Sequence, residues 1–391
     1  MSVLKISKWR SLDSVDSDEV HSPSTSTRLT SLDAFRGFAI AGMILVNNPG
    51  SFDAIYPQLD HAKWNGWTFA DLIFPFFLFI VGFSIVISLE KKRSRMGNRE
   101  LLWLIARRSV TLIGLGLLMH GFPHYNIATI RLPGTLQRIG ICYGTASMIA
   151  LWTKPRGKIL WILSLLASYW LLMKYFPVPG IGAGVFEPGK NFAAYVDSLF
   201  LAGHMWQNHP TWDPEGIVST IPAIATTLFG VVAGTWQLSG RSQRTKTAYL
   251  MGGGLVLIGV GYVLNQWLPI NKSLWTSSYC IFTAGCSCVS FASLYWITDM
   301  RGKKRWAAFL VAMGVNAIAL YVLSGLLNRI LLIDFVVGAA GTTNLRSVVF
   351  DQFFLRNFDL MNASFAYSLS YLMVIFLIAT IMKRKRWYVR L

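Results

Sequence analysis

The stretch that decides the fold is VNNPGSFDAIYPQLDHAKWNGWTFADLIFPFFLFIVGFSIVISL, residues 46–89. Its second half, residues 69–89, is almost wholly apolar and is long enough to cross a bilayer at a rise of about 1.5 Å per residue. This segment opens with Asp71 and carries Pro75 one turn later. Because a proline lacks an N–H group, the carbonyl of Asp71 loses its usual helical partner. With His61 just ahead of it, the stretch predicts a membrane helix with titratable groups gathered at one boundary of the bilayer.

The composition places the whole chain in a lipid bilayer. Of 391 residues, 53% are hydrophobic and only 14% are charged, which leaves too little polar surface for a soluble protein of this length. The formal net charge of +18 does not indicate a nucleic-acid partner, because the basic residues are spread over many loops instead of one face or arm. We therefore predict an all-α, polytopic membrane protein.

Ten apolar segments are long enough to span a bilayer. They cover residues 31–48, 68–90, 101–120, 134–152, 157–176, 217–238, 247–268, 274–298, 306–327 and 365–382. Residues 1–29 are polar and rich in Ser, Thr and Asp, which predicts a disordered tail before a transmembrane domain over residues 30–391. Two long loops, 177–216 and 328–364, interrupt the spans, and loops of such length are usually functional or disordered. The aromatic and polar residues of the first loop suit a structured cap over a polar cavity.

The distribution of Lys and Arg predicts the orientation. Twenty-six of the 36 basic residues lie in the two tails and in alternate loops. Since cytoplasmic loops carry the excess of Lys and Arg, we expect both termini in the cytoplasm and an even number of crossings. His61 and both long loops then lie on the non-cytoplasmic side.

Several motifs resemble those of one enzyme family. The strings SLDAFRG, VNNPG, HAKWNGWTFADLIFPFFLFIVG, RLPGTLQRIG, WDPEGIVSTIPAI with FGVVAG, PINKSLWTSSY and GVNAIALY follow one another along the chain. In this order they resemble the lysosomal heparan-α-glucosaminide N-acetyltransferases and their bacterial relatives, which are transmembrane acetyltransferases. The block that begins at His61 is the longest and the most specific.

The resemblance implies an acyltransferase. Members of that family take the acetyl group of cytosolic acetyl-CoA and deliver it to the amine of a glucosamine on the far side of the membrane. His61 matches the catalytic histidine of the family, and Asn47 matches a residue placed beside it. We therefore expect a multi-pass enzyme of the bacterial inner membrane with acetyl-CoA as co-substrate, an amino sugar as acceptor and no metal. Its relatives suggest a homodimer.

The residues near His61 suit this chemistry, although each has a second interpretation. An amine must lose a proton before it attacks a thioester, and histidine changes its charge near neutral pH. His61 either takes this proton or attacks the thioester itself. Asp71 either orients the imidazole, as the third member of a triad does, or only favours the helix dipole. Asn47 either donates a hydrogen bond to the oxyanion or caps the end of its helix.

A second set of residues is assigned to the two substrates. Arg36 either binds the phosphates of the CoA head or only pairs with Asp33 three residues earlier. Gln137 and Arg138 meet the cofactor only if it threads deep into the helix bundle. Thr30 and Asp33 have the spacing of a capping box. The candidates for the sugar site are Lys63, Trp64, Asn65, His204, Asp213 and Glu215. Trp64 also suits an interfacial aromatic belt, and the last three equally suit a role in ordering their loop.

A carrier is the competing function. Ten helices around a polar cavity also suit a protein that moves an amino sugar, or its acetylated form, across the membrane without chemistry. The sequence shows no internal repeat of the kind common among secondary transporters, so that architecture gains no support.

Overall fold

The computed structural model describes residues 29–338 and 341–389, and helices make up most of this part of the chain. The helices are α1 (Thr30–Asn47), α2 (Phe69–Arg93), α3 (Asn98–Gly121), α4 (Thr135–Trp152), α5 (Pro155–Tyr175), α6 (Phe192–Phe200), α7 (Ile217–Gln237), α8 (Gln243–Leu264), α9 (Ser277–Tyr295), α10 (Ala308–Val315), α11 (Ala317–Leu331), α12 (Leu345–Val349) and α13 (Leu360–Arg384). Two π-helical segments, Trp296–Met300 and Phe350–Leu355, follow α9 and α12. Strands β1 (Asp334–Gly338) and β2 (Gly341–Asn344) form an antiparallel pair. The predicted tail lies outside the described residues, apart from Leu29.

The predicted spans all coincide with helices, but their number is not confirmed. Within the described residues, seven helices are long and apolar enough to cross a membrane, or eight if the bent pair α10 and α11 counts as one span. The two remaining segments, α1 and α4, are short at 18 residues each and carry buried charged or amide side chains. The structure thus shows a mostly helical chain with several candidate spans, and within the described residues the antiparallel pair β1–β2 departs from the all-α class. The count of ten and the cytoplasmic termini stay predictions.

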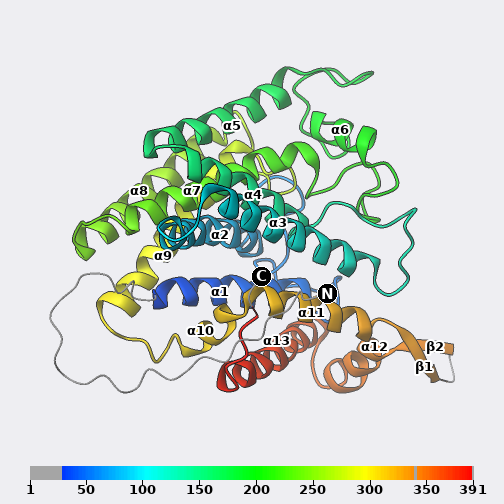
Figure 1. Cartoon of the computed structure of the whole chain (residues 1–391). Coiled ribbons are helices and arrows are strands. Elements are labelled where there is room, and N and C mark those ends of the chain that lie inside the picture. Colours follow the sequence, from blue (N-terminus) through cyan, green and yellow to red (C-terminus); the bar gives the residue numbers. More distant parts are fainter. Residues whose placement is uncertain (1–28, 339–340, 390–391) are drawn as a thin grey trace, which may run out of the picture.

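Helix α1 lies in the middle of the bundle, with α2 and α9 on one side and α10 and α13 on the other (Figure 1). Helices α2, α7 and α9 are mostly buried, whereas most side chains of α3, α5 and α8 are half-buried or exposed. The exposed side chains of these outer helices are largely apolar, as expected for helices that meet lipid. The inner helices therefore form the core that holds the buried polar groups.

Glycines allow α2 and α7 to cross at very short range. A Cβ atom on Gly82 would lie 1.8 Å from the carbonyl oxygen of Thr227, and one on Gly230 would lie 1.9 Å from that of Phe79. Such contacts between small residues are a common way for membrane helices to pack, because lipid offers little hydrophobic drive for association. The backbones of these two helices touch only because both positions lack a side chain.

The start of α1 is capped from a distance. Its first N–H groups, those of Thr30 and Ser31, donate to the carboxylate of Asp299 at 3.2 and 2.9 Å. The predicted capping box between Thr30 and Asp33 is therefore replaced by a carboxylate from the π-helical turn after α9. The predicted ion pair between Asp33 and Arg36 is confirmed, at 3.3 Å.

The pair α10 and α11 bends by 80° at Asn316. The amide of Asn316 donates to the carbonyl of Trp387 at 2.9 Å and accepts the N–H of Val389 at 3.0 Å. A break inside a membrane helix frees backbone groups, and such breaks occur where protein or water covers them. Here the segment that follows α13 packs on the break.

The α2–α7 crossing gives a stability prediction. Replacing Gly82 by Val should force the two backbones apart and cost about 3 kcal/mol or more, because a Cβ atom has no space beside the carbonyl of Thr227. The matched control is Gly259→Val on α8, where a new Cβ would meet nothing within 4 Å. The apparent Tm in detergent should fall for Gly82→Val and stay near the wild-type value for Gly259→Val. Equal Tm values for the two variants would contradict the packing described here.

Candidate active site

His61 and Asp71 form a hydrogen-bonded pair where the chain enters α2. Nδ1 of His61 lies 2.8 Å from Oδ1 of Asp71. The other carboxylate oxygen accepts the backbone N–H groups of Ala62, at 3.1 Å, and Thr68, at 3.0 Å. The Asp71 side chain is 1% exposed, whereas that of His61 is 42% exposed. Because a carboxylate only accepts hydrogen bonds, it orients the Nδ1–H group of His61 toward itself and leaves Nε2 as the nitrogen that takes a proton.

The carbonyl of Asp71 also has a partner, and it comes from another helix. The hydroxyl of Tyr279, a fully buried residue on α9, donates to this carbonyl at 2.5 Å. The expectation that Pro75 frees the carbonyl is thus consistent with the structure, which supplies the missing donor from α9. Both ends of Asp71, backbone and side chain, are held in place.

Lys272 is the residue that the sequence prediction missed. Its Nζ atom lies 2.9 Å from Nδ1 and 3.0 Å from Nε2 of His61, and 3.6 Å from Oδ1 of Asp71. Lys272 belongs to the PINKSLWTSSY string, between α8 and α9. One signal in the sequence pointed to it, since it is one of the few basic residues in loops that the charge distribution assigns to the non-cytoplasmic side.

The residues after His61 join the site to two other loops. The amide of Asn65 accepts from Asn271 at 3.2 Å, which links it to the loop of Lys272. Trp64 packs edge-on against Trp212 at 5.1 Å between ring centroids, which links it to the loop before α7. Trp64 therefore packs against the loop before α7, and its roles at the sugar site or in an interfacial belt stay predictions. Lys63 is exposed beside them.

Asn47 lies at the last residue of α1, where it is exposed. The neighbouring Asn48 is buried and donates to the carbonyl of Ile44 at 2.7 Å, so the helix end is capped by Asn48. Among the described residues, no hydrogen bond joins Asn47 to His61. Its role as an oxyanion donor stays a prediction.

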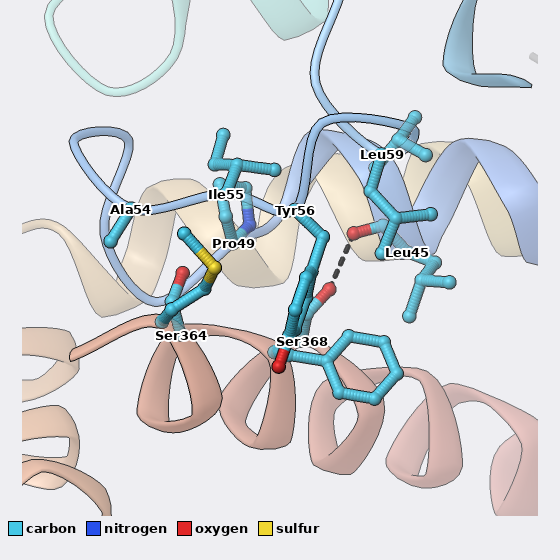
Figure 2. A pocket seen from close by; sticks show the side chains of 11 residues that line it. Leu45, Pro49, Ala54, Ile55, Tyr56, Leu59, Ser364 and Ser368 are labelled. Carbon is cyan, nitrogen blue, oxygen red and sulfur yellow. Dashed lines mark hydrogen bonds between the residues drawn. The ribbon is translucent and has the colours of Figure 1, made fainter. Parts of the chain in front are cut away.

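The segment between Asn47 and His61 rests on α13. The N–H groups of Gly50 and Ser51 donate to the backbone and hydroxyl oxygens of Ser364, at 3.2 and 3.0 Å. Beside these contacts, a small apolar cavity lies between this segment, the end of α1 and α13 (Figure 2). Its lining consists mainly of aliphatic and aromatic side chains and contains no charged residue. The hydroxyl groups in its lining, those of Tyr56, Ser364 and Ser368, donate hydrogen bonds to Asn362, Ser51 and Leu45, so the cavity belongs to the packing of the segment.

The acidic candidates of the long loop bind an arginine. Arg131 reaches both carboxylates, at 2.6 Å for Asp213 and 2.5 Å for Glu215. Nδ1 of His204 lies 2.9 Å from the carbonyl of Ile130. The contacts of His204, Asp213 and Glu215 are therefore those of residues that order the long loop. Arg131, which the sequence prediction did not select, connects the α3–α4 loop with the loop before α7.

The cofactor candidates lie at two levels of the bundle. Arg36 donates to Ser84 at 2.9 Å, so it lies about 20 Å from Asp71 along α2 at a rise of about 1.5 Å per residue. Arg138 is 1% exposed and stacks over the ring of Trp275 at 5.1 Å, in the same loop as Lys272. Its Nε and Nη1 atoms are buried without a hydrogen-bond partner among the described residues.

Gln137 points to a different neighbour. Its Nε2 atom lies 3.3 Å from Nδ1 of His120, and its Oε1 atom is buried without a hydrogen-bond partner in the described part of the chain. The structure therefore places Arg138 close to the His61 loops, Gln137 beside α3, and Arg36 at the far end.

A sequence model described as the catalytic region of heparan-alpha-glucosaminide N-acetyltransferase matches residues 28–260. The chain belongs to this family. It is 32% identical to the human heparan-alpha-glucosaminide N-acetyltransferase over 352 residues, which cover 75% of the chain and 52% of the human protein. It is 30% identical to the mouse protein of the same name over 359 residues, or 76% of the chain and 53% of that protein.

The chain spans about half the length of these two relatives. The region that matches the heparan-alpha-glucosaminide N-acetyltransferase model contains His61, Asp71 and Arg138, and it ends before the loop that carries Lys272. The geometry, and not that match, therefore brings Lys272 into the site.

One buried carboxylate in this member of the heparan-alpha-glucosaminide N-acetyltransferase family holds the long loop against α7. Asp197 on α6 accepts the N–H groups of Ile217, at 2.9 Å, and Asp213, at 3.3 Å. Burial, with a smaller contribution from the nearby Asp213, raises the pKa of Asp197 to about 6, although these hydrogen bonds oppose the shift. Asp197 is 2% exposed, so solvent screens its charge little.

The raised pKa of Asp197 predicts a pH-dependent stability. Between about pH 4 and pH 6 the folded protein holds a proton on this carboxyl that the unfolded chain lacks, so its contribution to the free energy of unfolding falls as the pH rises through that window. The loss is on the order of 3 kcal/mol. Asp197→Asn cannot ionise, so the Tm of the variant should gain on that of the wild type between pH 4 and pH 7. Parallel Tm curves for the two proteins would contradict the assignment.

Proposed function

We propose that the protein is a transmembrane acetyltransferase that moves the acetyl group of cytoplasmic acetyl-CoA to the amine of a glucosamine-type sugar on the periplasmic side. The observation that carries this proposal is the His61–Asp71 pair, which leaves one imidazole nitrogen oriented as a base at the end of a helix bundle. Family membership supports the reaction type. The distribution of Lys and Arg supports the side.

In this mechanism Nε2 of His61 takes a proton from the acceptor's ammonium, and the neutral amine attacks the acetyl carbon of the thioester. As the C–N bond forms and the C–S bond breaks, the nitrogen releases its second proton to solvent. The sulfur leaves as the thiol of CoA after it receives the proton from His61. Asp71 stabilises the imidazolium through the Nδ1–H group, and its two backbone donors keep it ionised and fixed. Asn47 donates to the oxyanion in the proposal. Transfer by way of an acetyl group on His61 is the second route for the same residues.

The substrates enter from opposite ends in this scheme. Arg36 binds phosphates of the CoA head at the end with the basic loops, and the unpartnered Nε and Nη1 atoms of Arg138 donate to carbonyl groups of the thioester arm. Gln137 lines the same path. Lys63, Trp64 and Asn65 contact the sugar, and His204, Asp213 and Glu215 hold the loop that encloses it. We place the protein in the bacterial inner membrane as a homodimer.

The first test removes the base. His61→Ala should lower kcat by about 10²–10⁴-fold, since a positioned general base contributes this much. The assay uses protein in vesicles with acetyl-CoA and glucosamine on opposite sides and measures N-acetylglucosamine by mass spectrometry. His124→Ala is the matched control, because His124 is an exposed histidine in the loop after α3. Full activity of the His61 variant would sink the proposal.

The second test keeps the shape of Asp71 and removes its charge. Asp71→Asn should lower kcat by about 10²-fold or more, because an amide no longer stabilises the imidazolium and can hold the wrong tautomer. KM for acetyl-CoA should change little, since Asp71 contacts His61 and not the CoA head in this scheme. Tm of the variant reports whether the fold survives. A folded variant with wild-type kcat would remove Asp71 from the mechanism.

A carrier is the second candidate, and the 80° bend at Asn316 favours it, because broken membrane helices often occur in transporters. The same vesicles distinguish the two functions. A carrier would accumulate unmodified glucosamine inside vesicles without acetyl-CoA, and His61→Ala would keep that uptake. An acetyltransferase yields product only when both substrates are present.

A further inference from the structure

A primary amine of the protein itself lies beside the proposed base. Nζ of Lys272 is within 3.0 Å of both ring nitrogens of His61, and the lysine side chain is 20% exposed. In the proposed reaction, the amine of the acceptor must approach this imidazole and the acetyl thioester together. Lys272 therefore places a primary amine, the same chemical group as that of the acceptor, inside the site.

The backbone that carries Lys272 is held on both sides. Asn271 is fully buried, and its side chain accepts the N–H of Leu274 at 2.8 Å. The hydroxyl of Tyr169 on α5 donates to the carbonyl of Leu274 at 2.7 Å. Trp275, next in the chain, is 1% exposed. Because these contacts fix the loop, the backbone of Lys272 is held within reach of His61, and the ion pair with Asp71 at 3.6 Å draws the amine to the same place.

We propose that Lys272 is an internal acetyl acceptor, so that the protein acetylates this lysine when it holds acetyl-CoA and no amino sugar is present. The inference rests on the proposed function, because it uses the same donor and the same base. It assigns a modification site within the active site, and Nε-acetyl-Lys272 is its product.

The step balances with the groups already present. Neutral Nζ attacks the acetyl carbon, a C–N bond forms, and the C–S bond of the thioester breaks. His61 takes the proton that the nitrogen loses and delivers it to the departing sulfur, which leaves as the thiol of CoA. Burial lowers the pKa of Lys272, although Asp71 and Glu215 oppose this, and a lower pKa enlarges the neutral fraction that can attack.

The product changes the site. An amide carries no charge, so acetylated Lys272 loses its ion pair with Asp71. The amide also places an acetyl group beside the imidazole, in the space that the acceptor's amine must enter. Acetylation of Lys272 should therefore lower the rate of sugar acetylation. The modification would reduce the activity of the enzyme after a period in which the acceptor is scarce.

The test incubates the purified full-length protein with isotopically labelled acetyl-CoA and no acceptor, and then maps the label on peptides by mass spectrometry. We expect label on Lys272 that survives hydroxylamine, because an amide resists it and an acetyl-imidazole does not. Lys63 is the matched control, since it is an exposed lysine two positions from His61. Its labelling should be at least about 10-fold slower, and His61→Ala should slow labelling of Lys272 by at least about 10-fold.

The possible outcomes separate the two proposals. N-acetylglucosamine formed in a parallel assay, with no label on Lys272, overturns the internal acceptor and leaves the proposed function standing. Equal labelling of Lys63 and Lys272 that persists in His61→Ala indicates ordinary chemical acetylation and also overturns it. No acetylated sugar and no label overturns both proposals. Addition of glucosamine should reduce labelling of Lys272, because the two amines compete for one position.

Discussion

The structure depends on the carboxylate of Asp71, a buried charge that must be matched by donors. It accepts hydrogen bonds from the imidazole of His61 and from the N–H groups of Ala62 and Thr68. An unpaired buried charge is very costly, so these donors fix the turn that leads into α2. The backbone carbonyl of Asp71 accepts a hydrogen bond from Tyr279, because Pro75 has no N–H group to donate to it. One residue thus joins the loop of His61, helix α2 and helix α9.

The close crossings of the inner helices make this arrangement possible. Glycines let the backbones of α2 and α7 touch, and a similar contact joins α1 and α10, where a Cβ on Gly37 would lie 1.7 Å from the carbonyl oxygen of Leu310. Tight packing leaves little room around buried polar groups, so each of them must find its partner among neighbouring helices. A few lack one within the described residues, among them Oε1 of Gln137 and two nitrogen atoms, Nε and Nη1, of Arg138. Because these nitrogen atoms of Arg138 can still donate hydrogen bonds, we propose that Arg138 binds a ligand.

The loops at the His61 end form one connected layer. Asn65 contacts Asn271, Trp64 contacts Trp212, and Arg131 holds the carboxylates of the long loop. Each contact joins two loops from different parts of the sequence. The site is therefore built from loops that stabilise one another, above a helix bundle that fixes where each of them begins. Because these loops stabilise one another, Asp213 and Glu215, which the sequence offered as sugar ligands, bind Arg131.

The sequence by itself determined the helical segments and the start of α2, and it offered the pairing of His61 with Asp71 as one of two interpretations. These features follow from local patterns: runs of apolar residues, a proline one turn after an aspartate, and a histidine near the helix start. Only the tertiary structure decided that Lys272 lies against His61, that Tyr279 serves the freed carbonyl, and that Asp299 caps α1. The partners in these contacts are more than 200 residues apart. Local patterns carry no information on such pairs, because the packing of distant helices brings them together.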